Sequence, residues 1–265
     1  QNFSARVGQA AKLSFKGASV DLVGTDTVNG VVAPTLVLPS GDLTLQATSG
    51  DVTLGKDATL LASGLSYDFE GAAAYTPGGA VRLVSDQGNV RVKNGAVVDV
   101  SAQGDADAGL VTVSAIKGVA AIAGTLKGQS GGGRTGRFLL DAKYANQDTT
   151  QKKNDFDQLT GVLEAGKFGE ERVIRLREGD VALISSVNAR RFVLSADQGK
   201  IDVYGKINAS GVKGGEIALY SKDQLTLHTT AELDASATGA GQSGGTVTLA
   251  TQTFALDGNG KPLGV

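Results

Sequence analysis

The chain repeats one pattern along almost its whole length: three short alternating runs, each closed by a turn. In one copy, apolar and polar residues alternate over 79–85, 88–92 and 96–101, and each run ends in Gly, Asn, Asp or Ser. Further copies of the same triplet occupy residues 43–62, 192–209 and 217–235. A three-strand unit of roughly 25–30 residues lies within the 20–50-residue periods of solenoid proteins. This repeat constrains the fold more than any other feature of the sequence.

Period-2 alternation places Val81, Leu83 and Val90 on one face of their strands and Arg82 and Arg91 on the other. A strand with one apolar face must bury it, and three such faces per turn can close on a shared interior. Successive turns then stack about 4.8 Å apart, first strand over first strand, so the sheets are parallel and the winding is right-handed. The pattern therefore predicts an all-β, right-handed parallel β-helix.

The whole chain, residues 1–265, is expected to form a single β-helix of roughly eight to ten coils at that spacing. Because it starts with Gln1 in the middle of a repeat and without an initiator methionine, we expect it to be a piece of a longer protein. Gly-Gly pairs at 78–79, 214–215 and 244–245 precede first strands, where a corner requires close backbone approach.

Two segments interrupt the repeat, and both are predicted to be extruded inserts. The first spans about 64–78, and the second spans about 141–172, after the first strand of its coil. Within the second, helical spacing of apolar residues, with Asp155 as cap and Gly166 as stop, predicts a short α-helix near 155–165. We expect its apolar side to lie on the outer wall of the solenoid. Residues 1–37 are less regular and are expected to form poorly matched coils or an edge-covering strand pair.

Charge and composition bound the partners. The net charge is −2, which gives no global attraction to nucleic acid. No apolar run approaches the roughly 18 residues of a membrane span, so we expect a chain that does not span a membrane. The chain has no cysteine, which is compatible with either redox compartment because a continuous core needs no disulfide staples.

Residues that could carry chemistry are few. The single histidine, His228, is expected to point outward, which disfavours a catalytic triad. Asp99, Asn208 and Asp234 are expected to align in one column, with Lys127, as a polar ladder that stabilises turns. No cofactor is expected. Calcium is possible through the aspartate pairs 105/107 and 155/157, but no calcium-loop pattern surrounds them. No catalytic or metal-ligating residue is therefore assigned.

Candidate contact residues lie in the two inserts and in a basic stretch. Aromatic side chains in the first insert are suited to stacking on sugar rings, or alternatively to pinning the loop to the wall. Arg175 and Arg177 alternate with apolar residues and should line an outer face, where neighbouring acids are expected to compensate their charge. The candidate ligand or partner contacts are Tyr67, Phe69, Tyr75, Tyr144, Arg175 and Arg177.

Several stretches resemble one family. The segment 156–168 leading into 175–181, together with 194–203, 207–211 and 214–220, resembles filamentous-haemagglutinin-type exoproteins. The resemblance covers about residues 40–255. It implies a very long Gram-negative protein, secreted to the cell surface by two-partner secretion through an outer-membrane barrel transporter, that acts in adhesion, aggregation and biofilm formation. The chain has no Arg-Gly-Asp tripeptide, so no binding residue of the family is carried over.

The resulting hypothesis is a non-catalytic rod or display module of a secreted or cell-surface adhesin, whose partners are host or bacterial surface glycans or proteins. The alternative is a β-helix that binds or degrades polysaccharide as a lyase or hydrolase. Degradation would need at least two outward carboxylates, or an Arg or Lys beside them, on adjacent coils.

Overall fold

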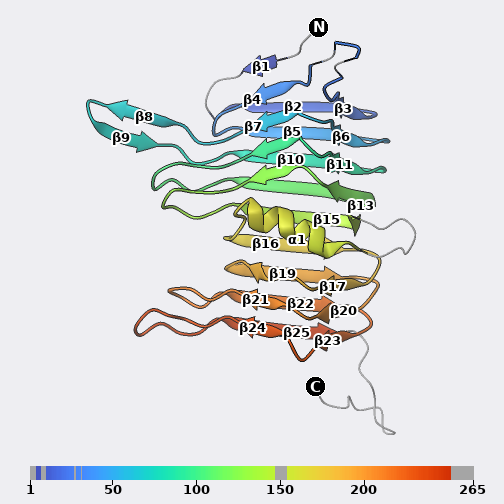
Figure 1. Cartoon of the computed structure of the whole chain (residues 1–265), viewed down its shortest axis with the longest axis vertical. Helices are drawn as coiled ribbons and strands as arrows, with labels where there is room; N and C mark the ends of the chain where they lie inside the picture. Colours follow the sequence, from blue (N-terminus) through green and yellow to red (C-terminus); the bar gives the residue numbers. More distant parts are fainter. Residues whose placement is uncertain (1–3, 7–9, 27, 31, 147–153, 252–265) are drawn as a thin grey trace.

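The computed structural model describes residues 4–6, 10–26, 28–30, 32–146 and 154–251. It confirms a right-handed parallel β-helix, in which coils stack along one axis (Figure 1). The first wall contains β2 (Lys12–Gly17), β5 (Asp42–Ala47), β10 (Ala80–Ser85), β13 (Leu110–Ile122), β15 (Arg137–Ala145), β16 (Glu171–Leu176), β19 (Arg191–Ala196), β22 (Glu216–Ser221) and β25 (Thr246–Thr251).

The second and third walls are built from shorter strands. The second contains β3 (Val20–Leu22), β6 (Val52–Leu54), β11 (Val90–Val92), the ends of β13 and β15, and then β17 (Val181–Leu183), β20 (Ile201–Val203) and β23 (Leu225–Leu227). The third contains β1 (Ser4–Arg6), β4 (Thr35–Val37), β7 (Thr59–Leu61), β12 (Val97–Asp99), β14 (Thr125–Lys127), β18 (Val187–Asn188), β21 (Lys206–Asn208) and β24 (Glu232–Asp234).

Inward side chains stack in columns because consecutive strands pair without a shift along the first wall. One column runs through Leu13, Leu43, Val81, Val111, Phe138, Arg172, Phe192, Ile217 and Val247. Every member from Leu43 to Ile217 is at most 1% exposed. Burial of such an apolar side chain stabilises by about 1.5–3 kcal/mol, so the columns hold the coils together. The predicted alternation of inward and outward residues is confirmed.

One member of this column was not expected. In β16 the inward series starts at Arg172, two residues before the apolar Ile174, and Arg172 lies between Phe138 and Phe192. The Arg172 side chain is 2% exposed and forms an ion pair with Glu164 at 2.8 Å. Because an arginine in a period-2 pattern is normally assigned to the outward face, the alternation alone does not predict this burial.

The first predicted insert does leave the coils, as an antiparallel hairpin. Strands β8 (Ser66–Phe69) and β9 (Ala72–Tyr75) pair with each other and project far from the walls (Figure 1). Between them, Glu70 and Gly71 have φ angles of 52° and 90°, the pair of positive values that a tight two-residue hairpin turn requires.

The described part of the second predicted insert is packed into the coils, and the predicted boundaries were wrong. Asp141 lies inside β15 and Arg172 inside β16, while residues 147–153 lie outside the described part of the chain. The helix α1 (Phe156–Ala165) forms as predicted, with the Asp155 side chain accepting from the Gln158 N–H. It lies in contact with β14 and β18, at the place of a third-wall strand (Figure 1).

The apolar side of α1 therefore faces the interior and not the outside of the solenoid. Phe156, Leu159 and Leu163 are at most 2% exposed and belong to the continuous core. At the helix end, Gly166 does not adopt the left-handed conformation expected of a stop glycine, since its φ is −80°. A Cβ there would lie 2.2 Å from the Leu126 carbonyl oxygen, so close packing on β14 requires the glycine.

The described residues before position 38 form parallel strands rather than an edge-covering pair. β2 pairs with β5, β3 with β6 and β4 with β7, each in the register of the later coils. This segment is therefore a coil of the same β-helix. The long connection between β3 and β4 interrupts the regular strand spacing, so this coil was not recognised from the sequence.

Candidate functional site

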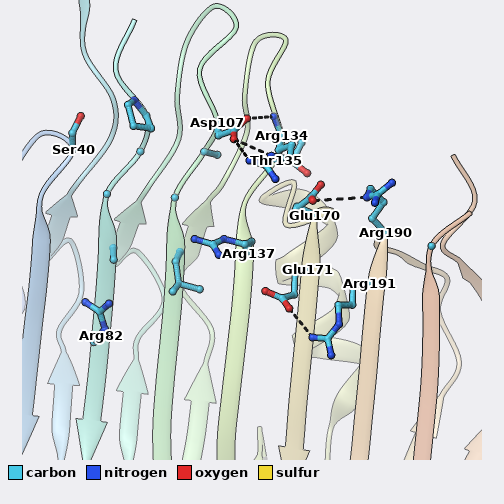
Figure 2. A pocket seen from close by; sticks show the side chains of 18 of the residues that line it. Ser40, Arg82, Asp107, Arg134, Thr135, Arg137, Glu170, Glu171, Arg190 and Arg191 are labelled. Carbon is cyan, nitrogen blue, oxygen red and sulfur yellow. Dashed lines mark hydrogen bonds and ion pairs between the residues drawn. The ribbon is translucent and has the colours of Figure 1, made fainter. Parts of the chain in front are cut away.

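A groove with a volume of about 830 Å³ lies at the corner where the chain enters the first wall (Figure 2). Its lining comes from seven successive coils, those of β5, β10, β13, β15, β16, β19 and β22. It extends from Ser40 to Glu216 and so runs along the solenoid axis. A site of this kind suits an elongated ligand.

Glycines at the corner create the groove. Gly41, Gly79 and Gly109 each precede a first-wall strand, and their backbones touch: a Cβ on Gly109 would lie 1.8 Å from the Gly79 carbonyl oxygen. Glycine is therefore required for the close stacking of the coils at this corner, and Gly79 and Gly109 line the groove with backbone alone. Further along, Glu170 and Arg190 occupy the same register position, and their side chains project into the groove (Figure 2).

Most charges in the groove are matched in pairs. Arg134 holds Asp107 at 2.7 Å, and Arg191 bridges Glu171 at 2.6 Å and Glu216 at 2.8 Å. The pKa of Asp107 is lowered, chiefly by the hydrogen bond from Arg134, and the pKa of Arg134 is raised by the same bond. The pKa of Arg191 is raised, chiefly by its hydrogen bond to Glu216. These groups are therefore held in their charged forms.

Among the arginines that line the groove, Arg82 and Arg137 have the weakest pairing with carboxylates. Arg82 is 3.9 Å from Asp42, and its side chain is 41% exposed. Among the described residues, Arg137 has no carboxylate oxygen within 4.0 Å, and it is exposed. Figure 2 shows both side chains on the first-wall side of the groove, with Arg137 reaching toward the side where Arg82 lies. The groove thus offers two guanidinium groups with spare hydrogen-bonding capacity.

The arrangement is better suited to holding an ionic ligand than to acid–base chemistry. A glycoside hydrolase needs one carboxyl group kept protonated by a raised pKa, beside a second carboxylate. In this groove the pKa of Asp107 is lowered, and each of the lining carboxylates lies within 4.0 Å of an arginine.

The aromatic residues predicted as contacts divide into two groups. Tyr67 and Phe69 lie on the same face of β8, their ring centroids 6.2 Å apart, and are 39% and 64% exposed. Tyr75, on β9, packs against the loop of the next coil, since a Cβ on Gly104 would lie 2.2 Å from its ring. Tyr75 therefore pins the base of the hairpin, whereas the other two rings are displayed.

The remaining predicted contacts lie at the opposite ends of the first-wall strands and are engaged. Arg175 contacts Asp197 at 2.7 Å, and Arg177 contacts Asp141 at 2.7 Å. The Tyr144 hydroxyl donates to Glu178 at 2.7 Å, a bond that raises its pKa. The structure does not bring these three residues together with the hairpin.

The other polar candidates have structural partners. His228 stacks on Tyr204 with ring centroids 3.8 Å apart, and its Nε2 lies 3.1 Å from Asp202. Asp155 caps α1, and Asp157 accepts from the Ser185 N–H at 2.8 Å. In the part of the chain that the structure describes, no group of three or more acidic or histidine side chains is placed to hold a metal ion.

The expected polar column is divided. Asn208 is aligned with Asp234, and each accepts from the serine two residues later. Asp99 makes the same turn with Ser101 and is aligned with Lys127, but on the far side of α1.

Arg82 and Arg137 were not predicted as groove residues. Their common feature is their position: Arg137 directly follows the corner glycine Gly136, and Arg82 lies three residues after Gly79. Only the fold brings these corners together, because the residues belong to different coils.

No protein-family model matches the chain, and neither the curated proteins nor the solved structures contain a match to it. Among the described residues, no helix is long and apolar enough to cross a membrane.

Proposed function

We propose that the chain is a non-catalytic rod and display module of a large secreted or cell-surface adhesin that acts in attachment, aggregation or biofilm formation. Its in-register columns support this role, because a solenoid in which each coil packs only on its neighbours transmits load along its axis and can be extended without limit.

The β8–β9 hairpin is the observation that carries the proposal. It holds two exposed aromatic rings, Tyr67 and Phe69, away from the coils (Figure 1). Exposed aromatic side chains are common in recognition surfaces and stack well on sugar rings or on partner proteins. On this proposal the coils set the reach, and the hairpin makes contact with a glycan or protein on a host or bacterial surface.

The place of action follows from the same proposal. The full-length protein would leave a Gram-negative cell through an outer-membrane barrel transporter and remain at the cell surface. The absence of cysteine agrees with export in an unfolded state, since no disulfide has to form afterwards. Transport of the chain fused behind a secretion domain, with and without the barrel, tests this part of the proposal.

Excision of the hairpin tests the contact role. Leu65 and Thr76 already meet at its base, where the Thr76 N–H donates to the Leu65 carbonyl at 2.9 Å. Residues 67–74 can therefore be replaced by Gly-Gly while Ser66 stays paired with Tyr75 and Tyr75 keeps its contact with the next coil. Beads coated with the intact chain should bind cells, and beads coated with the excised variant should lose most of that binding.

Point variants sharpen the experiment. Tyr67→Ser with Phe69→Ser should reproduce the loss, whereas Asp68→Ser, on the opposite face of the same strand, should bind as the intact chain does. Unchanged adhesion after excision would contradict the contact role of the hairpin.

A second candidate function is supported by the groove: binding of a polysaccharide. Its length along the axis and its paired charges favour holding a chain over cleaving it. Incubation with acidic polysaccharides, with detection of unsaturated or reducing ends, distinguishes binding from lyase or hydrolase activity.

A further inference from the structure

We propose that the part of the groove between β10 and β15 binds the carboxylates of an acidic, uronate-containing glycan chain that lies along the solenoid axis. We call this part the arginine segment; it comprises Arg82, Asp107, Leu110, Arg134 and Arg137. The inference deepens the proposed adhesive function by assigning a ligand class to a surface other than the hairpin.

Two guanidinium groups in this segment are available to an anion. Within the described chain, Arg82 has one carboxylate neighbour, Asp42, at 3.9 Å, which is beyond hydrogen-bond distance. Arg137 has no such neighbour within 4.0 Å in the described chain. A guanidinium presents a planar fork of N–H donors that matches a carboxylate, so each arginine can hold one uronate group by paired, charge-assisted bonds.

The spacing of the two arginines suits a repeating chain. Arg82 lies on β10 and Arg137 on β15, two coils apart, with β13 between them, and Arg137 is aligned with Ala80, two residues before Arg82 along the strand. Two coil steps correspond to roughly 9–10 Å along the axis. Each sugar of an extended pyranose chain advances by about the height of one coil. The carboxylates of every second sugar can therefore face every second coil.

The surface between the arginines is neutral and partly apolar. Leu110, at the start of β13, is half-buried and lines the groove. Gly79 and Gly109, which carry no side chain, line the groove on the same side. The C–H face of a sugar ring can pack on Leu110 while its carboxylate turns to an arginine.

The loop side of the arginine segment contributes one more positively charged group. Arg134 stands on the loop before β15 and is 69% exposed, but it already holds Asp107 in a two-point pair. This pair fixes the loop and leaves the sheet-side arginines to the ligand (Figure 2).

The groove beyond β15 is less suited to an anion. Two arginines there face three glutamates, whereas the arginine segment and its rim hold three arginines against two aspartates. Glu170 and Arg190, on adjacent coils, both line the groove and lie 3.8 Å apart as an ion pair. An anionic chain should therefore be held at the arginine segment and not along the whole groove.

Calorimetric titration of the purified chain with a hexamer of galacturonic acid tests the inference. The intact chain should bind it, and Arg82→Gln with Arg137→Gln should weaken binding at least tenfold. The matched control is Arg91→Gln with Lys93→Gln, which removes the same charge from β11 and the residue that follows it, outside the groove, and should change affinity less than twofold. Circular dichroism verifies that both variants fold.

Three results would overturn the inference: no binding of the hexamer at millimolar concentration, an equal loss in the control variant, or equally tight binding of a hexaglutamate peptide. The last would identify an acidic peptide as the occupant. A neutral glucose hexamer should not bind.

The hairpin-excised variant separates this inference from the adhesive role. It should retain binding of the galacturonate hexamer, since the groove residues remain. Loss of hexamer binding on excision would contradict the groove assignment, whereas retained cell binding on excision contradicts only the hairpin's role.

Discussion

The Glu164 carboxylate accepts a hydrogen bond from the backbone N–H of Asn188 at 2.7 Å. It thereby takes the place of the backbone carbonyl that a neighbouring strand would provide. Because α1 replaces a third-wall strand, the edge of β18 has no backbone neighbour on that side. Side chains supply the partners: the Asn188 carbonyl accepts from Arg172 at 3.2 Å, and Arg172 is itself paired with Glu164. The helix is thereby built into the wall.

Removal of this carboxylate should be costly. Glu164→Ala leaves the buried Arg172 guanidinium without its counter-charge and the Asn188 N–H without its acceptor, so we expect the free energy of unfolding to fall by about 3 kcal/mol. Glu232→Ala, which breaks an exposed pair with Lys206, should cost far less, because solvent screens that pair. Urea unfolding followed by circular dichroism measures both. Equal losses would show that the Glu164 site contributes no more than a surface pair.

Two glycines of the helical segment should respond in opposite directions to alanine. A Cβ on Gly166 would lie 2.2 Å from the Leu126 carbonyl oxygen, so Gly166→Ala must displace α1 from β14 and should cost about 1–3 kcal/mol. Gly161, within the helix, has nothing within 4 Å of such a Cβ. Gly161→Ala should therefore stabilise by about 0.5–1 kcal/mol through helix propensity. Thermal unfolding of the two variants checks the sign of each change.

The period-2 alternation was enough to predict the coils, because residues such as Val81 and Leu83 are buried simply by the geometry of a strand. The helix at 156–165 was also predictable from its spacing and from the Asp155 cap. Its place in the wall was not, because apolar spacing gives the buried side of a helix but not the surface that covers it.

The groove depended on relationships that the linear sequence does not contain. Arg82 and Arg137 line the same groove only because the stacking of the coils places β10 and β15 two coils apart along the axis. The burial of Arg172 was not predicted, for a different reason. It is made favourable by Glu164 and by the Phe168 carbonyl, which accepts a hydrogen bond from Arg172 at 2.6 Å. Neither partner is evident from the alternation around it.

Acid should act on the groove through Asp107. Its pKa is lowered below the ordinary value of 3.8, chiefly by the hydrogen bond from Arg134. Because the folded-state pKa is the lower one, the pair's contribution to stability is fully present above about pH 4 and is lost as the pH falls through the folded-state pKa. Arg134→Gln should therefore unfold with a weaker dependence on pH between about pH 2 and pH 4 than the intact chain.

The unfolding midpoint in urea, measured across this range, tests the acid prediction. Asp107→Asn should show the same flattening as Arg134→Gln, because either change removes the pair. An unaltered pH profile in both variants would contradict the assignment of the acid sensitivity to this pair.

The β8–β9 hairpin should unfold locally without destabilising the coils of the β-helix. Gly71 has a φ of 90°, and Gly71→Ala places a side chain in a backbone conformation that costs about 1–2 kcal/mol for an L-residue. The strain should fall on β8–β9 alone, because these strands pair only with each other. Amide exchange at Phe69 and Ala72 should accelerate roughly tenfold, as 1.4 kcal/mol corresponds to a factor of ten. The amides of β10, at Val81 and Leu83, serve as the internal control and should exchange at their original rates, with the global free energy of unfolding unchanged within about 0.5 kcal/mol. Faster exchange in β10 as well would mean that the hairpin and the coils unfold as one unit, and that the hairpin cannot be treated as an independent element displayed on a rigid support.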